Sequence, residues 1–142
     1  MRLLAVTPAL MIATLVSCND PLGPLVDGKP YALARVNGEA VPWAFPSGPS
    51  IDAGWIKLVD DTLAQRFEGL SNGPSVGEWM LSGKYTLRFG QLIIDYRPNW
   101  HAGSLGPAHP VDTLYASGNG LVLRETGYIT DPDTVVRYYA RP

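Results

Sequence analysis

Cysteine is almost absent from this chain of 142 residues, which contains only Cys18. A single cysteine cannot form a disulfide within the chain, so the fold depends on its buried core. The scarcity also excludes a zinc site built from several thiolates. Histidine is scarce too, and His101 and His109 are spaced in a way that matches no metal-binding motif. We therefore expect neither a metal nor a cofactor.

The chain also lacks an excess of basic residues. It has 11 Lys and Arg residues against 13 Asp and Glu residues, a formal net charge of −2, and no block of like charge. Proteins that bind nucleic acids normally carry a basic patch. The composition therefore predicts no nucleic-acid partner.

Long hydrophobic runs are missing except at the start of the chain. Arg2 precedes a mostly apolar stretch, Leu3–Val16, that contains Pro8 and ends in small residues. This stretch is shorter than the ~20 apolar residues that a membrane-spanning helix needs. A short charged segment followed by such a stretch is typical of a secretory signal peptide.

The four residues Leu15-Val16-Ser17-Cys18 resemble the lipobox of bacterial lipoproteins. The resemblance implies that the leader is cut before Cys18 and that this cysteine carries the lipid. A thiolate is a good nucleophile for forming the thioether, and two or more acyl chains anchor a protein stably. We therefore expect an extracytoplasmic protein held by Cys18 at a cell-envelope membrane, inner or outer. The alternative is an ordinary signal peptide with a coincidental cysteine, or a buried free thiol.

Three segments follow from this interpretation. Residues 1–17 form the signal peptide, and residues 18–30 form a lipidated N-terminus and a flexible tether rich in proline and glycine. Residues 31–142 are long enough for one domain with a real core and too short for two ordinary domains. We expect a single domain there.

Alternating apolar and polar residues dominate this domain. In Lys84–Gly90, three aromatic or aliphatic residues alternate with Lys, Thr and Arg, as in a strand with one buried face. Similar stretches recur between turn residues at 31–36, 54–59, 62–68, 77–82, 91–96, 111–116, 120–126 and 134–140. The pattern predicts an all-β fold, an antiparallel up-and-down meander that closes into a small barrel of eight or nine strands. A β-sandwich is the alternative.

The opening of the domain, "YALARVNGEAVP", resembles the first strand and turn of small bacterial lipoproteins with a lipocalin-like domain. Lipocalins place a Gly-x-Trp motif on the first strand, whereas the match here, Gly77-Glu78-Trp79, lies in the middle of the chain. The resemblance implies a calycin-type barrel with an apolar interior and, by analogy, a small ligand.

Aromatic residues suggest where such a ligand would bind. Trp43 and Phe45 lie between prolines, and Trp100 and His101 lie in the longest segment without alternation, residues 97–110. These four side chains are the candidate ligand-binding residues at the mouth of the barrel. Alternatively, Trp43 and Phe45 close one end of the barrel.

Other side chains have simpler interpretations. His101, His109, Ser104 and Asp112 match no catalytic spacing, and Asp60-Asp61 and Asp131-Pro132-Asp133 suit turns better than calcium loops. Six aromatic residues on alternating positions are expected in the core: Trp55, Phe67, Trp79, Tyr85, Phe89 and Tyr96.

These features together predict a protein that is not an enzyme. We expect a membrane-anchored envelope lipoprotein that binds a small apolar or amphipathic molecule in or at the mouth of its barrel. The alternative is a structural or protein-interaction module with a solid barrel core, whose partner is an envelope protein.

Overall fold

The computed structural model describes residues 28–46, 48–101, 106–126 and 134–141, which form ten β-strands and no helix. The strands are β1 (Tyr31–Val36), β2 (Glu39–Ala40), β3 (Trp43–Ala44), β4 (Ser50–Leu58), β5 (Leu63–Asn72), β6 (Ser75–Arg88), β7 (Gln91–Asp95), β8 (Val111–Ser117), β9 (Gly120–Thr126) and β10 (Thr134–Ala140). The expected lipid-attachment residue Cys18 lies outside the described residues. None of the described segments is a helix long and apolar enough to span a bilayer.

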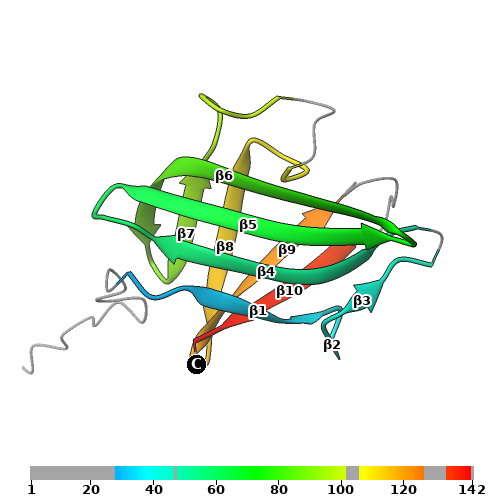
Figure 1. Ribbon diagram of the computed structural model, residues 1–142. Helices are drawn as coiled ribbons and strands as arrows, with labels where there is room; N and C mark the ends of the chain where they lie inside the picture. The colour runs from blue at the N-terminus through cyan, green and yellow to red at the C-terminus, as the bar shows by residue number, and fades with distance from the viewer. Residues whose placement is uncertain (1–27, 47, 102–105, 127–133, 142) are drawn as a thin grey trace, which may run out of the picture.

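Eight of the strands close into an antiparallel barrel, which confirms the fold class predicted from the alternating pattern (Figure 1). Consecutive strands from β4 to β10 pair with one another, and β1 pairs with both β10 and β4 to complete the ring. The short strands β2 and β3 pair with β1 and β4 outside this ring. Closure leaves few free strand edges, which otherwise promote association with other chains.

The connections alternate between two ends of the barrel because neighbouring ring strands run antiparallel. The turn end carries the short turns at residues 59–62, 89–90 and 118–119. Asp60 stabilises the first of these turns by accepting hydrogen bonds from the backbone N–H groups of Thr62 (2.7 Å) and Leu63 (2.8 Å), which confirms its assignment as a turn residue. Asp131-Pro132-Asp133 lies outside the described residues. The loop end carries the connections at residues 37–49, 73–74 and 96–110.

Residues 77–82 and Lys84–Gly90 are expected as two strands separated by a turn, but residues 77–82 and 84–88 lie in the single strand β6, and Phe89 and Gly90 form the turn after it. Gly83 lies within this strand, and a Cβ atom there would come within 2.6 Å of the Asp95 backbone oxygen. It would also lie 2.8 Å from the Tyr96 ring. Glycine is therefore present because β7 approaches closely and not because the chain turns.

The side chains of β5 that point into the barrel are not the ones expected. Arg66 and Glu68 are fully buried and point into the barrel, whereas the intervening Phe67 lies half-buried on the outside. Trp55 on β4 also lies half-buried on the outside and stacks on Phe67, with ring centroids 5.6 Å apart. The expectation that Trp55 and Phe67 belong to the core is wrong, because charged residues occupy the inner positions of β5.

Of the other aromatic residues expected in the core, Trp79, Tyr85 and Tyr96 are buried. Phe89 is fully exposed in the turn between β6 and β7, with a positive φ of 48°. Fully buried aliphatic residues from around the ring complete the interior: Ile51, Ile56, Leu58, Leu92, Ile94, Leu114 and Leu121.

Candidate functional site

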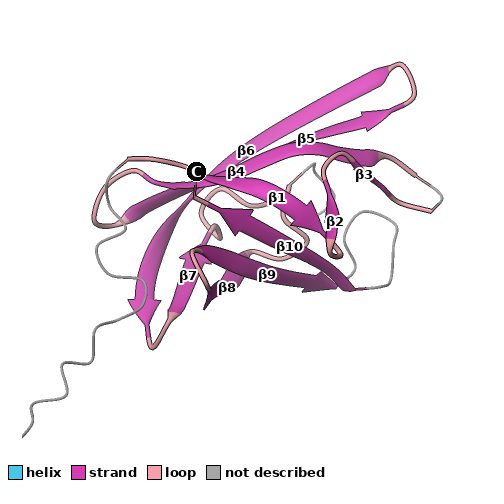
Figure 2. Ribbon diagram, turned by 90° about the horizontal axis from the view of Figure 1, so that it is seen from below, coloured by secondary structure: helices cyan, strands magenta, loops and turns pink. Residues whose placement is uncertain are grey.

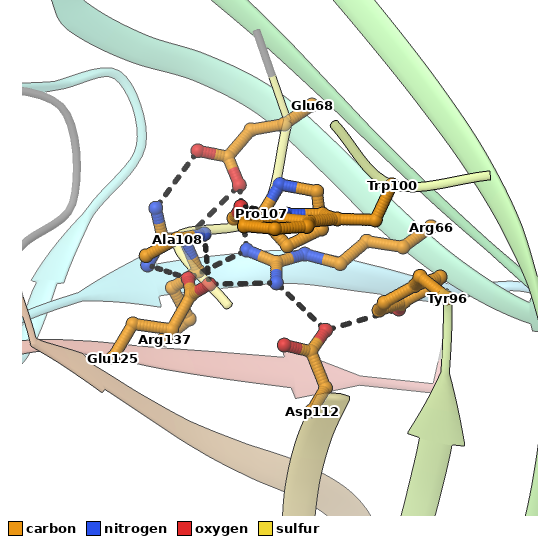
Figure 3. Close-up of polar contacts among 9 residues, drawn as sticks. All are labelled: Arg66, Glu68, Tyr96, Trp100, Pro107, Ala108, Asp112, Glu125 and Arg137. Atoms are coloured by element: carbon orange, nitrogen blue, oxygen red, sulfur yellow. Dashed lines mark hydrogen bonds and ion pairs between the residues drawn. The ribbon is translucent and has the colours of Figure 1, made fainter. Parts of the chain in front are cut away.

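Five charged side chains meet inside the barrel and form what we call the interior charge cluster (Figure 3). Its members are Arg66 and Glu68 on β5, Asp112 on β8, Glu125 on β9 and Arg137 on β10. Each is at most 2% exposed. Side chains alternate between the two faces of a strand, and each of these five residues falls on an inward-facing position of its strand.

Arg66 is the centre of the cluster. Its two Nη atoms donate to the two carboxylate oxygens of Glu125 over 3.1 and 2.8 Å. Nη1 also donates to Asp112 Oδ2 (2.8 Å), and Nη2 donates to Glu68 Oε2 (3.2 Å). This fork geometry is the arrangement in which arginine binds carboxylates most strongly.

Arg137 links the same two glutamates from the other side. It donates from Nη1 to Glu125 Oε2 (2.7 Å) and from Nη2 to Glu68 Oε1 (2.9 Å). Its Nε donates to Glu68 Oε2 over 3.1 Å. The cluster therefore ties β5, β9 and β10 together through the barrel interior, and Asp112 adds β8.

The connection between β7 and β8 covers the cluster at the loop end (Figure 3). The Ala108 backbone N–H donates to Glu125 Oε1 (3.1 Å), and the Tyr96 hydroxyl donates to Asp112 Oδ2 (3.0 Å). Trp100 packs against the core, and its Nε1 donates to the Pro107 carbonyl oxygen (3.0 Å). The Arg66 guanidinium also lies over the Trp79 ring, 5.0 Å from its centroid.

The two acidic groups that contact Arg66 Nη1 differ in their pKa values. Burial opposes the ionisation of Glu125, but Arg66 and Arg137 outweigh it and lower the pKa of that carboxyl from 4.5 to about 2. Burial raises the pKa of Asp112, against the attraction of Arg66, and the negative charge of Glu125 adds to the rise. Burial also disfavours the charge of Arg137, but Glu68 and Glu125 raise its pKa. Arg137 and Glu125 are therefore charged at neutral pH.

The interior differs from the apolar one that the lipocalin resemblance implies. Two arginines and three carboxylates bind mainly to one another, and among the described residues no group of three or more potential metal ligands could hold a metal ion. Three buried atoms nearby, Arg66 Nε, Trp79 Nε1 and the Tyr139 hydroxyl oxygen, have no hydrogen-bond partner among the described residues. The charged groups of the cluster therefore link strands to one another, and this use leaves them poorly placed to bind a ligand.

The four expected ligand-binding residues all lie on connections at the loop end. Trp43 and Phe45 contact each other edge to face, with ring centroids 4.8 Å apart, and Phe45 is buried whereas Trp43 is half-buried. Trp100 and His101 come from the other long connection, where Trp100 covers the cluster and His101 is exposed. The structure thus joins Trp43 to Phe45 and places Trp100 beside the interior charge cluster.

The potential catalytic residues do not form a buried site in the described part of the chain. His101 and His109 are exposed, whereas Asp112 is buried within the cluster, and Ser104 lies outside the described residues. One feature of the sequence does indicate the buried charges on β5. Arg66 and Glu68 flank Phe67 at a spacing of two, so the charged pair and the aromatic residue had to face opposite sides.

The chain matches no family model, and neither a curated protein nor a solved structure shows significant similarity to it.

Proposed function

We propose that this protein is a lipid-anchored envelope protein with a solid barrel, and that it acts through its outer surface and loops as a non-enzymatic interaction module. The observation that carries the proposal is the interior charge cluster. It occupies the space between β5, β8, β9 and β10 in which a barrel of this size would hold a small ligand.

A ligand bound at this position would have to separate the charged groups. Removing one partner from a buried ion pair typically costs about 3–5 kcal/mol, because the remaining charge has no compensation. An apolar ligand offers no hydrogen bonds to replace those lost by Arg66, Glu125 or Arg137. The arrangement therefore favours a closed interior over a cavity for apolar molecules.

The membrane anchor in this proposal rests on the sequence around Cys18. The first barrel strand begins at Tyr31, 13 residues beyond that cysteine. A linker of this length reaches at most ~45 Å when extended, so the barrel would stay close to the membrane while remaining free to meet envelope proteins.

A second candidate function is the binding of a small amphipathic molecule at the mouth of the barrel. The half-buried Trp43 ring, held edge to face by Phe45, is the observation that favours it. Such a site would lie outside the interior charge cluster and would use the aromatic face and a polar rim.

A ligand titration followed by tryptophan fluorescence tests both candidates. Long-chain fatty acids and lysophospholipids are added to the full-length protein and to the variants Trp43→Phe, Trp79→Phe and Trp100→Phe. A solid barrel gives no saturable change, and a mouth site gives a change that Trp43→Phe removes. A saturable change that disappears only in Trp79→Phe would contradict the proposal, because Trp79 is the buried tryptophan next to Arg66.

A further inference from the structure

Strand β6 is paired on both sides over only part of its length. Its 14 residues pair with β5 from Ser75 to Lys84, but they pair with β7 only from Lys84 to Arg88. No described strand pairs with the second side of β6 between residues 75 and 83. In Figures 1 and 2, this part of β6 lies at the free margin of the β4–β5–β6 sheet.

The open part of this strand is residues 75–81, which we call the β6 edge. Beyond it, the Asn99 side chain donates to the Ser82 backbone oxygen (3.1 Å), and Gly83 packs against Asp95. The β6 edge is therefore seven residues long, about the length of a typical strand. It is long enough to accept a further strand.

The register decides which backbone groups face the open side. Asn72 pairs with Ser75 across the two-residue turn at residues 73–74, so Ser75 and every second residue after it bond to β5. The hydrogen bond from the Tyr85 N–H to the Thr62 oxygen fits this alternation. The backbone N–H and C=O groups of Val76, Glu78 and Met80 consequently point away from β5.

The side chains of the same three residues lie on the outer face of the sheet. Val76 is 75% exposed, Met80 is 55% exposed, and Glu78 lies between them and is also exposed. Met80 is opposite Phe67, which in turn is opposite Trp55, so an apolar row crosses β4 and β5 and ends at the β6 edge. An added strand would extend this row by one residue opposite Met80.

A surface depression next to Val76 offers a place for one more apolar side chain. It has a volume of about 270 Å³ and is lined in part by Pro49, Leu70 and Val76. This volume is below the ~300–1,000 Å³ of typical small-molecule pockets. It suits a single side chain of a bound peptide better than a separate ligand.

The β6 edge lacks the devices that usually protect free edges. Natural edge strands carry lysine, proline or a bulge, and residues 75–81 contain no lysine or proline, with Glu78 as the one charged residue. Antiparallel pairing with a second copy centred on Glu78 would place two carboxylates opposite each other, which is destabilising. The charge therefore favours a strand of another protein with a basic residue opposite Glu78.

We propose that the β6 edge binds an extended segment of a partner protein by strand addition. The segment would place apolar residues opposite Val76 and Met80 and a Lys or Arg opposite Glu78. The main chain would supply affinity, and the alternating side chains would supply selectivity. This inference rests on the proposed function, because it names the surface through which a solid barrel would act.

The test uses the full-length protein, labelled for NMR, and synthetic peptides of about eight residues in which valine alternates with threonine. One peptide carries a central lysine and its matched counterpart a central glutamate. Addition of the lysine peptide is expected to shift the amide signals of Val76, Glu78 and Met80 and to slow their exchange with solvent. We expect the lysine peptide to bind about threefold more tightly than the glutamate peptide, as one cross-strand charge pair allows.

Two variants make the test specific. Glu78→Lys should reverse the preference between the two peptides, whereas Glu39→Lys, which changes an exposed glutamate on β2, should leave it unchanged. Glu78→Pro removes an outward N–H without removing a bond to β5, so it should abolish binding. If Glu78→Pro does not fold, the peptide preference of Glu78→Lys still tests the inference.

Three results would overturn the inference. The first is that no amide signal of the β6 edge shifts at about 1 mM peptide, a concentration at which even a weak complex would form. The second is that the shifts are confined to other strands, and the third is that the same shifts appear without peptide as the protein concentration rises. The last result would identify a second copy as the occupant. None of these results would involve Arg66 or Arg137, whereas failure of the proposed function would appear as ligand-dependent changes at those two residues.

Discussion

Arg66 on β5 and Glu125 on β9 are joined across the barrel interior by two parallel hydrogen bonds of 3.1 and 2.8 Å. The two strands lie on opposite sides of the ring, with three strands between them in each direction. This pair therefore fixes the width of the barrel at the level of the interior charge cluster. Several consequences can be measured.

Replacing Glu125 with glutamine should destabilise the fold strongly. Glu125 accepts hydrogen bonds from Arg66, Arg137 and the Ala108 N–H, and glutamine removes the one carboxylate that is contacted by both arginines and by that backbone N–H. The expected loss in the free energy of unfolding is about 3–5 kcal/mol. Urea denaturation of Glu125→Gln measures it, with the exposed Glu39→Gln as the matched control. Equal stability of the two variants would contradict the role given to Glu125.

Replacing Asp112 with asparagine should be tolerated far better at neutral pH. Asp112 Oδ2 accepts hydrogen bonds from Arg66 and Tyr96, and an asparagine oxygen can accept both. The substitution also leaves two arginines with two glutamates, so the cluster becomes neutral. We expect Asp112→Asn to equal or exceed the wild type in free energy of unfolding at pH 7. A loss as large as that of Glu125→Gln would show that the negative charge of Asp112 is required.

The pH dependence of stability should separate the same two residues. The pKa of Glu125 is lowered on folding, from 4.5 to about 2, so its contribution is present above pH 4.5 and is lost as the pH falls towards 2. The pKa of Asp112 is raised on folding, so stability linked to it is present below pH 3.8 and is lost as the pH rises through the folded value. The free energy of unfolding of the wild type and of both variants, measured between pH 2 and 7, checks this pH dependence. Glu125→Gln should lose less stability than the wild type on acidification, and Asp112→Asn should gain relative to the wild type as the pH rises.

Much of the fold could be predicted from the sequence because strand positions depend on local alternation. The first strand and the last four strands begin where the pattern places them, within a residue at their ends. The inward face of β5 could not be predicted in this way, because Arg66 and Glu68 are buried through ion pairs with residues far along the chain. Arg66 pairs with Asp112 and Glu125, 46 and 59 residues away, and Glu68 pairs with Arg137, 69 residues away. Local alternation assigns Phe67 to the core, and long-range ion pairing reverses the assignment.

Gly83 provides a second example with its own prediction. The alternating pattern places Gly83 in a turn between two strands, whereas in the structure Gly83 allows the close approach of Asp95 and Tyr96. Gly83→Ala should cost about 1–3 kcal/mol of unfolding free energy, because an added methyl group has no space there. Gly69→Ala on β5 is the control, since its Cβ would meet only ordinary contacts at 3.8 Å or more. Thermal unfolding of both variants measures the difference. Equal unfolding temperatures for Gly83→Ala and Gly69→Ala would contradict the close-packing explanation.

The proposed anchor can be tested without reference to the barrel. Cys18→Ala should move the protein from the detergent-extractable membrane fraction to the soluble fraction, or leave the leader uncleaved, because the site of lipid attachment is gone. Fractionation and mass measurement of the N-terminus give the result. Unchanged fractionation with normal processing would reject the lipoprotein interpretation.

We propose that the interior charge cluster fills the barrel and leaves no room for a ligand, and the NMR signals of the arginine side chains show whether this is so. Arg66 and Arg137 are fully buried with their Nη atoms bonded to carboxylates, so their guanidinium protons should give separate, slowly exchanging signals. We predict that these signals persist unchanged when a long-chain fatty acid is added in excess. Averaged signals that exchange rapidly with solvent, or a saturable shift on adding the fatty acid, would instead show an interior that is open to solvent or to a ligand.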